Sequence, residues 1–385
     1  MALSGLDIYK LLPKTNCREC GFPTCLAFAM QLAKKAIAID KCPYLSKESR
    51  DSLEASSLPP IRLISIGEGE EKLEVGNETV LFRHEEKFHH PCGLGFILED
   101  SSSDSELKEA LAGINKLKFE RVGQALNVNL VAVRQNGNTK RFCDAVKVIR
   151  DNTGLALALM AKDTDALREA LKICAQRKPL LYRAGPDNLE EIAKIALEFK
   201  CPLVVWSEDL EGLSSLATKL NSLGVVDLVL DTGKKTVKDK LWYFTQVRRQ
   251  ALKKANRSLG YPLFAIVEKD DIYEEAIEAA TYICKYGGIV LVRGRGAPEV
   301  FSLLTLRQNI YTDPQKPLQI EPKLYSVGQV DTKSPVMVTT NFSLTYYTVL
   351  GEVEASKVPS YILSVDTEGM SVLTAWAAEK FTPDK

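Results

Sequence analysis

Four cysteines near the N-terminus form the pattern with the clearest chemistry in this sequence. They are Cys17, Cys20, Cys25 and Cys42, in the spacing C-x2-C-x4-C-x16-C, and Pro43 follows the last of them. Four thiolates this close in sequence can bind one inorganic centre, either an iron–sulfur cluster or a structural zinc ion. Zinc sites usually combine two separated C-x2-C pairs, whereas a cluster of three cysteines with a distant Cys-Pro is typical of iron–sulfur loops. The spacing therefore favours a [4Fe–4S] cluster.

Two short helices are expected to position these cysteines within a first domain, residues 1–57. DIYKLLP reads as one helix that stops at Pro13, and CLAFAMQLAKKAIA reads as a second helix that starts at Cys25. The positive end of the helix dipole at Cys25 favours an anionic centre. Gly21 and Pro23 supply turns that let backbone N–H groups face the sulfur atoms.

A repeat of apolar segments separated by amphipathic helical patterns follows. Continuous apolar strands alternating with helices indicate a buried parallel sheet. Eight such units favour a closed (β/α)8 TIM barrel over residues 93–315, and an open doubly wound sheet is the alternative. No G-x-G-x-x-G follows the first strand, which argues against a dinucleotide fold. The expected strands are GFILED (95–100), NVNLVAV (127–133), LALALMA (155–161), KPLLYRA (178–184), CPLVVWS (201–207), VVDLVLD (225–231), YPLFAIV (261–267) and GIVLVRG (288–294).

The segments on either side of the barrel have a different composition. SSLPP (56–60) reads as a linker, and residues 58–92 as a linker with short strands or a hairpin. The Pro-rich stretch 311–330 reads as a second linker. Residues 320–385 read as strand, loop and helix, then the strand SYILSVD (360–366), a loop and another helix. This predicts the opening of another α/β unit that is too short to be a complete doubly wound domain.

Composition narrows the function classes. Fifty basic and fifty acidic residues give a formal net charge of zero, so nothing suggests nucleic acid or a membrane surface as a partner. No apolar run approaches the length of a membrane span, and the N-terminus lacks the features of a signal peptide. We therefore expect a cytoplasmic protein. The five remaining cysteines are expected to be free buried thiols: Cys92, Cys143, Cys174, Cys201 and Cys284.

The motifs together resemble a known family. KLLPKTNCRECGFPTCLAFAMQLAKKA and DKCPY resemble the N-terminus of the large (gamma) subunit of the corrinoid/iron–sulfur protein of the acetyl-CoA (Wood–Ljungdahl) pathway. The resemblance continues to the end of the chain through LFRHEEKF, FTQVRRQALKK, RSLGYPL, RQNIYTDPQKP, SPVMVTTNFSLTYYTV and SYILSVDTEGMSVLTAWA.

The resemblance implies a methyl-group carrier rather than a stand-alone enzyme. Its corrinoid cobalt, as Co(I), would accept a methyl group from methyltetrahydrofolate through a separate methyltransferase and pass it to acetyl-CoA synthase/CO dehydrogenase. The [4Fe–4S] cluster would return an electron whenever cobalt is oxidised to Co(II). The implied partner is the small subunit of a heterodimer, and the implied fold adds a C-terminal α/β, Rossmann-like, corrinoid-binding domain to the barrel.

The resemblance also implies site residues. The cluster ligands would be the four N-terminal cysteines. The corrinoid contacts would lie in two loops: Thr339, Thr340, Asn341, Thr345 and Tyr346 in the first, and Gly369, Met370, Ser371, Val372, Leu373 and Thr374 in the second. All three histidines precede residue 91, so no D-x-H-x-x-G histidine is available to cobalt. Members of the family extend beyond the position of Lys385, so the corrinoid domain is expected to be incomplete in this chain.

Other interpretations are open. The chain could be an iron–sulfur electron-transfer subunit whose barrel docks a partner without corrinoid, or a barrel methyltransferase that binds a pterin itself. Four carboxylates at predicted strand ends have the position of catalytic groups in barrels, but structural or docking roles are expected for them: Glu99, Asp163, Asp231 and Glu268. His84, His89 and His90 are expected to be ordinary polar residues.

Overall fold

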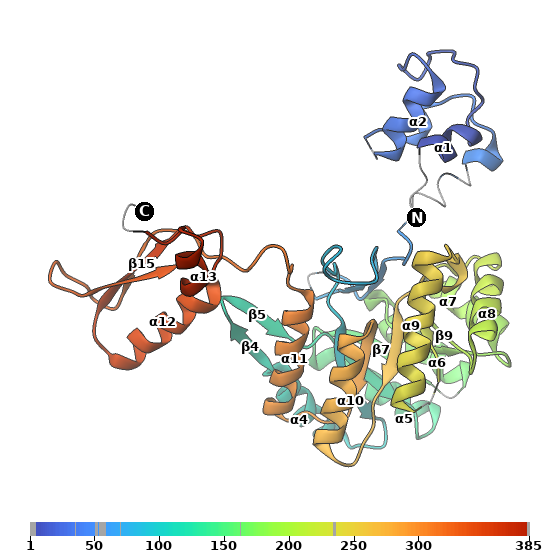
Figure 1. Ribbon diagram of the computed structural model, residues 1–385. Helices are drawn as coiled ribbons and strands as arrows, with labels where there is room; N and C mark the ends of the chain where they lie inside the picture. Colours follow the sequence, from blue (N-terminus) through green and yellow to red (C-terminus); the bar gives the residue numbers. More distant parts are fainter. Residues whose placement is uncertain are drawn as a thin grey trace.

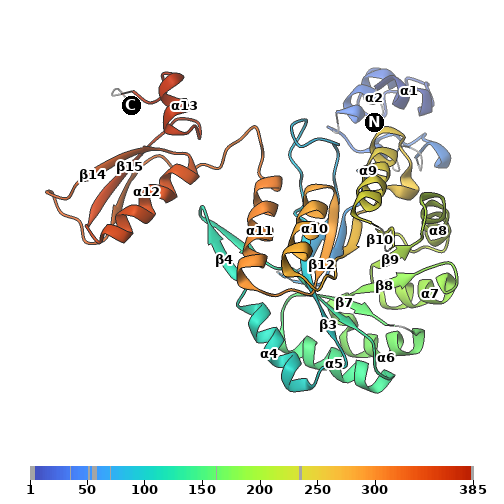
Figure 2. The ribbon, with the colours of Figure 1, turned by 60° about the horizontal axis from the view of Figure 1, so that its bottom comes forward.

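A closed barrel of eight parallel strands forms the centre of the molecule (Figures 1 and 2). The computed structural model describes residues 5–34, 36–50, 53, 59–69, 71–161, 163–233 and 236–382. The barrel strands, in their order around the ring, are β10 (Leu228–Asp231), β11 (Leu263–Ile266), β12 (Gly287–Val292), β3 (Gly93–Glu99), β6 (Leu130–Arg134), β7 (Ala156–Met160), β8 (Leu180–Ala184) and β9 (Leu203–Trp206). Each predicted strand overlaps one of these strands, which confirms the barrel and excludes the open sheet.

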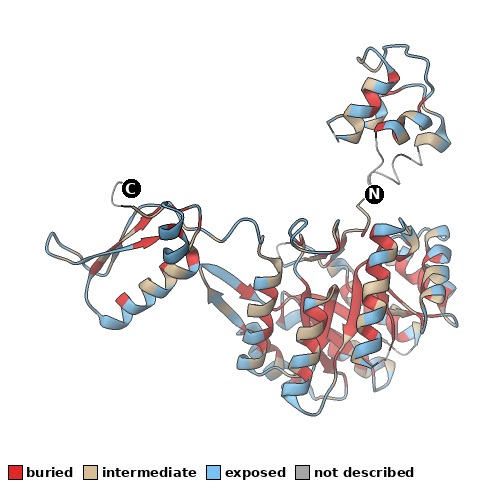
Figure 3. Ribbon diagram, in the orientation of Figure 1, coloured by how far each residue is buried: buried red, intermediate tan, exposed pale blue. Residues whose placement is uncertain are grey.

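One α-helix follows each barrel strand and covers it from outside, so the strands are buried from both sides (Figure 3). Polar residues placed just after the strands start most of these helices; Ser103 and Glu106, for example, form a reciprocal capping box. The helices are α4 (Asp104–Asn115), α5 (Thr139–Asn152), α6 (Thr164–Cys174), α7 (Leu189–Phe199), α8 (Leu210–Ser222), α9 (Val237–Lys253), α10 (Ile272–Cys284) and α11 (Ala297–Tyr311), with short 3-10 turns η2 (Ala175–Arg177) and η3 (Arg257–Leu259).

A small antiparallel hairpin closes the end of the barrel at which the strands begin. It consists of β1 (Ile64–Ile66) and β2 (Leu73–Val75), and its apolar side chains belong to the barrel core. The predicted strands of this region are confirmed, although the chain turns between β1 and β2 and not at the Gly-Asn pair that follows β2. In the described part of the chain, the hairpin thus covers the end of the barrel at which the strands begin.

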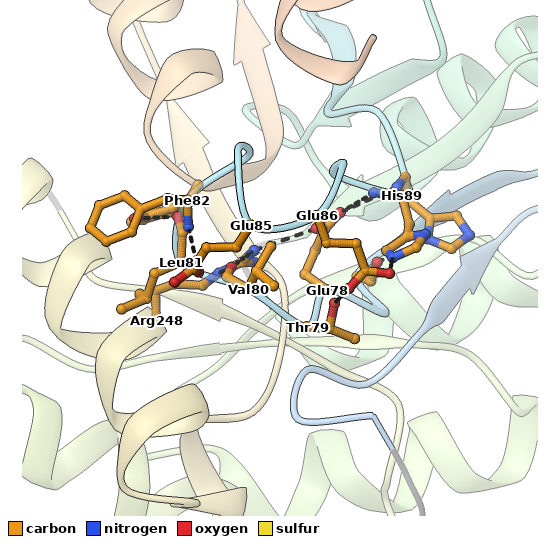
Figure 4. Close-up of polar contacts among 12 residues, drawn as sticks. Glu78, Thr79, Val80, Leu81, Phe82, Glu85, Glu86, His89 and Arg248 are labelled. Carbon is orange, nitrogen blue, oxygen red and sulfur yellow. Dashed lines mark hydrogen bonds and ion pairs between the residues drawn. The ribbon is translucent and has the colours of Figure 1, made fainter. Parts of the chain in front are cut away.

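The segment after β2 is fixed to the barrel by a buried ion pair (Figure 4). The guanidinium of Arg248 on α9 lies 3.4 Å from the carboxylate of Glu78 and donates to the carbonyl of Val80 at 2.6 Å. Glu78 also accepts the backbone N–H groups of His89 and His90. Two segments that are far apart in the sequence therefore hold each other in place here.

The N-terminal unit has its own small core. It contains α1 (Gly5–Leu11), α2 (Cys25–Ala33) and the 3-10 turn η1 (Ile39–Lys41), and both predicted helices are confirmed, although the second ends at Ala33. Its core gathers Ile8, Leu12 and Phe28 with Cys25 and Cys42. The predicted linker at residues 56–60 lies mostly outside the described residues.

The C-terminal unit is a three-stranded sheet with one long helix on it. Strand β15 (Ser360–Val365) lies between β14 (Val336–Thr340), to which it is parallel, and β13 (Leu324–Val327), to which it is antiparallel. Helix α12 (Ser343–Ser356) packs through Tyr346 and Val353 against Ile362 of β15, and the short α13 (Val372–Ala377) follows. The stretch 311–330 was expected to be a linker, but it contains β13, because Leu324–Val327 pairs along the free edge of β15.

Two further expectations differ from the structure. A hairpin of β4 (Lys118–Arg121) and β5 (Gln124–Asn127) precedes β6, and it extends towards α12 (Figure 1). No continuous apolar run marks these two strands, KFER and QALN, in the sequence. All nine cysteines are free, but Cys284 is exposed and Cys143 is half-buried, because both lie towards the outer surface of their helices and not in the core.

Candidate functional site

The four N-terminal cysteines lie on neighbouring segments of the N-terminal unit. Cys25 is the first residue of α2, whose N-cap is Thr24, and its backbone N–H donates to the side chain of Asn16 at 2.8 Å. Cys42 follows η1 and donates its N–H to Ile39. The loop that carries Cys17 and Cys20 bends back through a turn in which the N–H of Gly21, at φ 83°, donates to the carbonyl of Arg18.

Burial and charge both act on this group of thiols. Burial raises the pKa of the Cys42 thiol, and the proximity of Cys20, Cys25 and Cys17 raises this pKa further. Four thiolates so placed repel one another, so the fully deprotonated set needs a cationic centre. Within the described residues, no three His, Cys, Asp or Glu side chains already have metal-binding geometry. The four cysteines thus lie near one another, but their side chains do not converge on a single point.

In the C-terminal unit, Asn341 ties the two predicted loops together. It follows β14, and its Oδ1 accepts hydrogen bonds from the backbone N–H of Thr367 at 3.0 Å, the hydroxyl of Thr367 at 3.1 Å and the N–H of Gly369 at 3.0 Å. Its amide nitrogen lies 3.1 Å from a carboxylate oxygen of Asp366. Because β14 and β15 are parallel, both loops leave the sheet at the same edge. The structure therefore brings residues 339–343 and 364–371 together.

Three buried hydroxyl groups beside this loop junction have no hydrogen-bond partner. They belong to Thr339, Thr340 and Ser364, whose exposed fractions are 1%, 0% and 2%. Thr339 and Ser364 are directly paired across the strands and share a face of the sheet, whereas Thr340 lies on the opposite face. Unpartnered buried hydroxyls are costly, about 1–3 kcal/mol each. A polar group inserted at this edge would offset that cost.

The other predicted corrinoid contacts differ in their surroundings. Tyr346 is buried and packs on Tyr325, with ring centroids 4.8 Å apart, so it forms part of the core under α12. Thr345 is half-buried on the same helix. In the second loop Gly369 is buried at φ 74°, while Val372 and Leu373 are exposed at 36% and 84%. Their contact with a corrinoid stays a prediction.

Sequence reasoning missed several residues of this junction. Ser364, Asp366 and Thr367 were not singled out, although they lie in the same SVDTEG stretch as Gly369. The signal was a Ser-Val-Asp-Thr run directly after an apolar strand, a position where polar side chains meet the neighbouring strand end. Gln319 was missed as well, and it lies 3.4 Å from the amide nitrogen of Asn341.

The strand-end carboxylates have structural partners, as expected. Glu99 and Glu268 both pair with the guanidinium of Arg134, at 3.2 and 2.8 Å. Asp163 caps α6 by accepting the N–H of Ala166. Asp231 accepts the hydroxyl of Tyr182 at 3.0 Å.

The histidines also have ordinary partners. Nδ1 of His90 lies 2.9 Å from the carbonyl oxygen of Gly76, and Nε2 of His89 lies 3.3 Å from Glu86 (Figure 4). The ring of His84 stacks on Phe82. These contacts describe polar residues that fasten the segment after β2.

The sequence comparisons decide the family. Residues 63–385 match the family described as CO dehydrogenase/acetyl-CoA synthase delta subunit, and residues 12–44 match one described as "Putative Fe-S cluster". The chain is 46% identical to the corrinoid/iron-sulfur protein large subunit of Moorella thermoacetica over 386 residues, which cover 100% of this chain and 86% of that protein. The chain belongs to the corrinoid/iron–sulfur protein large-subunit family. The family expected from the motifs is thus confirmed.

Archaeal relatives of this corrinoid/iron–sulfur family are also similar over the full chain. The acetyl-CoA decarbonylase/synthase complex subunit gamma of Methanothermobacter thermautotrophicus is 38% identical, over 97% of this chain and 84% of that protein. Among solved structures, dihydropteroate synthase from Vibrio fischeri ES114 matches 58% of this chain and 95% of its own, with 15% identity and a TM-score of 0.45. That weak likeness carries no argument about function. No helix of the described residues is long and apolar enough to cross a membrane.

Proposed function

We propose that this chain is the corrinoid-carrying subunit of a methyl shuttle in the reductive acetyl-CoA pathway. When bound, the corrinoid supplies a cobalt that accepts a methyl group originating from methyltetrahydrofolate, through a methyltransferase, and yields it to acetyl-CoA synthase. A [4Fe–4S] cluster supplies the electron that restores cobalt after oxidation. The names of the relatives support the corrinoid and iron–sulfur parts of the proposal. The chain would act as a heterodimer with the small subunit.

The observation that carries the proposal is the loop junction at the end of β14 and β15. A corrin ring carries many amide groups, so its pocket needs hydroxyl and backbone groups beside apolar surface. Thr339, Thr340 and Ser364 offer buried hydroxyls without partners, and Asn341 holds the two loops in one arrangement. The exposed side chain of Leu373 adds apolar surface next to them.

The chain offers the cobalt no histidine in this unit. The three histidines of the sequence, at positions 84, 89 and 90, all lie in the segment that precedes the barrel, and His90 is bonded there to the carbonyl of Gly76. The groups of this unit that would hold the corrinoid are therefore hydroxyl, amide and backbone groups. The identity of an axial ligand is a main control on the reactivity of a bound cofactor.

The four N-terminal cysteines suit the second cofactor, a [4Fe–4S] cluster. Four thiols of the N-terminal unit, two of them buried, are the donor set that a [4Fe–4S] cluster uses. The backbone N–H of Cys25 donates to the side-chain oxygen of Asn16, and this hydrogen bond fixes the loop against the start of α2. With all four thiolates bound to a cluster, electron transfer is the role that we propose for this unit.

The test is cobalt content. The heterodimer, purified from cells supplied with a corrinoid, should contain cobalt by elemental analysis and show corrinoid absorption bands beside the visible absorption shoulder of an iron–sulfur cluster. Thr340→Val should lower cobalt occupancy, because it removes a buried hydroxyl without changing the shape of the side chain. Thr332→Val, at an exposed position before β14, is the matched control and should leave occupancy unchanged. A cluster shoulder without cobalt in the unsubstituted protein would instead support an electron-transfer subunit.

A further inference from the structure

The open end of the barrel contains a polar cavity that the proposed function does not use. Its volume is about 770 Å3, within the range of small-molecule sites. In TIM barrels the ends of the strands and the loops after them form the active or binding site. The cavity lies at this end, and it is lined by Arg134, Met160, Tyr182, Arg183, Trp206, Glu208, Asp231, Thr232, Gly233, Lys240, Ile266, Glu268, Lys269 and Glu278.

Among the described residues that line the cavity, four cations and four carboxylates give a formal charge of zero, and three of these cations lie beside a carboxylate. Arg134, from β6, lies 2.8 Å from Glu268, so this pair crosses the mouth towards the loop after β11. Lys269 lies 3.0 Å from Glu278, and Arg183 lies 3.9 Å from Asp231. Each of these cations already has a carboxylate partner. A ligand with no net charge therefore fits this cavity better than an anion or a cation does.

Polar groups that hydrogen-bond to one another line the side of the barrel mouth formed by the ends of β8, β9 and β10. Asp231, 4% exposed, accepts the hydroxyl of Tyr182 at 3.0 Å and the N–H of Gly233 at 2.8 Å. Burial, followed by the charge of Asp231, raises the pKa of Tyr182, so its hydroxyl stays protonated and continues to donate. The Asp231 carboxylate is held in one orientation, and its remaining lone pairs can accept from a ligand.

Two donors on the same side lack a partner. They are the hydroxyl of Thr232, which is fully buried, and the indole N–H of Trp206. The guanidinium of Arg183 stacks on the Trp206 ring at 4.0 Å from its centroid, which creates a flat, polar wall. A Cβ atom at position 233 would lie 2.8 Å from the Trp206 ring nitrogen, so only glycine fits beside it.

We propose that the barrel mouth is a binding site for a small, uncharged, planar molecule that carries an amide. Its N–H group would donate to Asp231, its carbonyl oxygen would accept from Thr232, and its flat part would lie against the guanidinium of Arg183. Binding would supply the partner that the Thr232 hydroxyl lacks. The site lies in the barrel, whereas the shuttle function rests on the N- and C-terminal units, so each proposal can fail without the other.

Benzamide and benzoate form a matched pair of probes for this site. They have the same shape, but only benzamide carries an N–H donor and no charge. Ligand-observed NMR titration of the purified protein should give a dissociation constant in the millimolar range for benzamide, as expected for a molecule of this size, and at least tenfold weaker binding of benzoate. No binding of benzamide, or equal binding of both probes, would overturn the proposal.

Two substitutions locate the binding. Asp231→Asn replaces an acceptor-only group with one that also donates, so it should weaken benzamide binding about tenfold and reduce or reverse the preference over benzoate. Asp227→Asn is the matched control, because Asp227 precedes the same strand at the opposite end of the barrel and pairs with Arg62. Thr232→Val, which retains the shape of the side chain, should also weaken benzamide binding. Unchanged affinity in both Asp231→Asn and Thr232→Val, with the far-ultraviolet spectrum intact, would contradict the assignment.

Discussion

Individual buried charges fix parts of this molecule that the strand pattern does not. Arg248 and Glu78 have side chains that are only 5% and 8% exposed, and they join α9 to the segment that enters the barrel. Burial lowers the pKa of Arg248, while the nearby Glu78 carboxylate acts in the opposite direction. Removal of one partner of such a pair destabilises the folded state, because the other partner remains as an uncompensated buried charge.

Glu78→Gln should therefore be strongly destabilising. The expected loss is about 3 kcal/mol in the free energy of unfolding, because the Arg248 guanidinium would remain buried with only carbonyl acceptors. Urea denaturation followed by circular dichroism measures it. Glu169→Gln, which breaks an exposed pair with Lys172, is the control and should leave the midpoint unchanged. Equal midpoints for the two variants would show that the buried pair is dispensable.

Glu299 gives the barrel a pH dependence. Burial, and then the charge of Glu275, raises its pKa from an ordinary value of 4.5 to about 7. The folded state thus keeps a proton that the unfolded state releases across this interval, so the contribution of Glu299 to stability falls as the pH rises from about 4.5 to about 7. The stabilisation is present at low pH and lost above the folded pKa.

Glu299→Gln should remove this dependence, since glutamine resembles the protonated acid at every pH. We expect the melting temperature of the variant to exceed that of the unsubstituted protein at pH 8 and to match it at pH 5. Calorimetric scans at both values measure the difference. A gap that is the same at both pH values would show that Glu299 does not titrate in this window.

At the scale of elements, the β4–β5 hairpin contacts the C-terminal unit. The turn of the hairpin contains Gly123 at φ 72°, and a Cβ atom there would lie 2.2 Å from the hydroxyl oxygen of Tyr347 on α12. The hairpin is in turn held to α11 by Gln308, which accepts from Arg121 at 2.6 Å. Because Gly123 and Tyr347 lie so close together, the hairpin packs against α12.

Gly123→Ala should weaken the contact between the β4–β5 hairpin and α12. Alanine is strained at positive φ, and its methyl group would displace the Tyr347 side chain. Trypsin should then cleave faster after the exposed Lys323, which lies directly before β13 of the C-terminal unit. Gly113→Ala on α4, where a Cβ atom meets nothing within 4 Å, is the control and should not alter cleavage. Identical cleavage rates in the two variants would show that the hairpin does not hold the C-terminal unit in place.

At the scale of the whole molecule, three separate apolar cores correspond to the three units. The cysteines lie in the N-terminal core and the hydroxyl-lined loops in the C-terminal unit, while the barrel lies between them in the chain. Because the cores are separate, one unit can lose its cofactor while the other units stay folded.

The face of the C-terminal sheet opposite α12 is apolar and exposed. Leu324, Val336 and Val338 on this face are 52–55% exposed. Within the described residues this apolar face is open.

Cys20→Ala tests the independence of the units. We expect it to remove the absorbance of the cluster and the reductive rescue of oxidised cobalt, because four thiolates are required. Methyl transfer starting from pre-reduced protein, and the melting of the barrel, should be unchanged. Cys284→Ala, at an exposed cysteine on α10, is the control and should retain the cluster. Collapse of methyl transfer in a folded Cys20→Ala protein would assign the cluster a second role.

The barrel could be predicted because its signal is local. Runs such as LALALM and CPLVVW are apolar throughout, and a strand buried on both faces has no other composition. Polar caps such as Asp163 and Ser103 are a local signal of the same kind, because each starts the helix that follows it. The β4–β5 strands and β13 gave no such signal, because these strands are largely exposed and need no continuous apolar run. Ser364 and Thr367 escaped notice for a related reason, since their importance arises from Asn341 on a neighbouring strand.

The sequence alone determined the cysteine motif, the eight-stranded barrel and the family, because spacing, apolar periodicity and contiguous motifs are properties of neighbouring residues. The tertiary structure decided which polar groups meet. Asn341 ties two loops that are 25 or more residues apart, and Arg134 reaches Glu268 across the barrel mouth. Tyr182, Trp206 and Asp231 meet because β8, β9 and β10 pair side by side, whereas Arg134 meets Glu268 because β12 pairs with β3 and closes the sheet. Closure of a sheet places the ends of distant strands around one cavity, and no local pattern records that meeting.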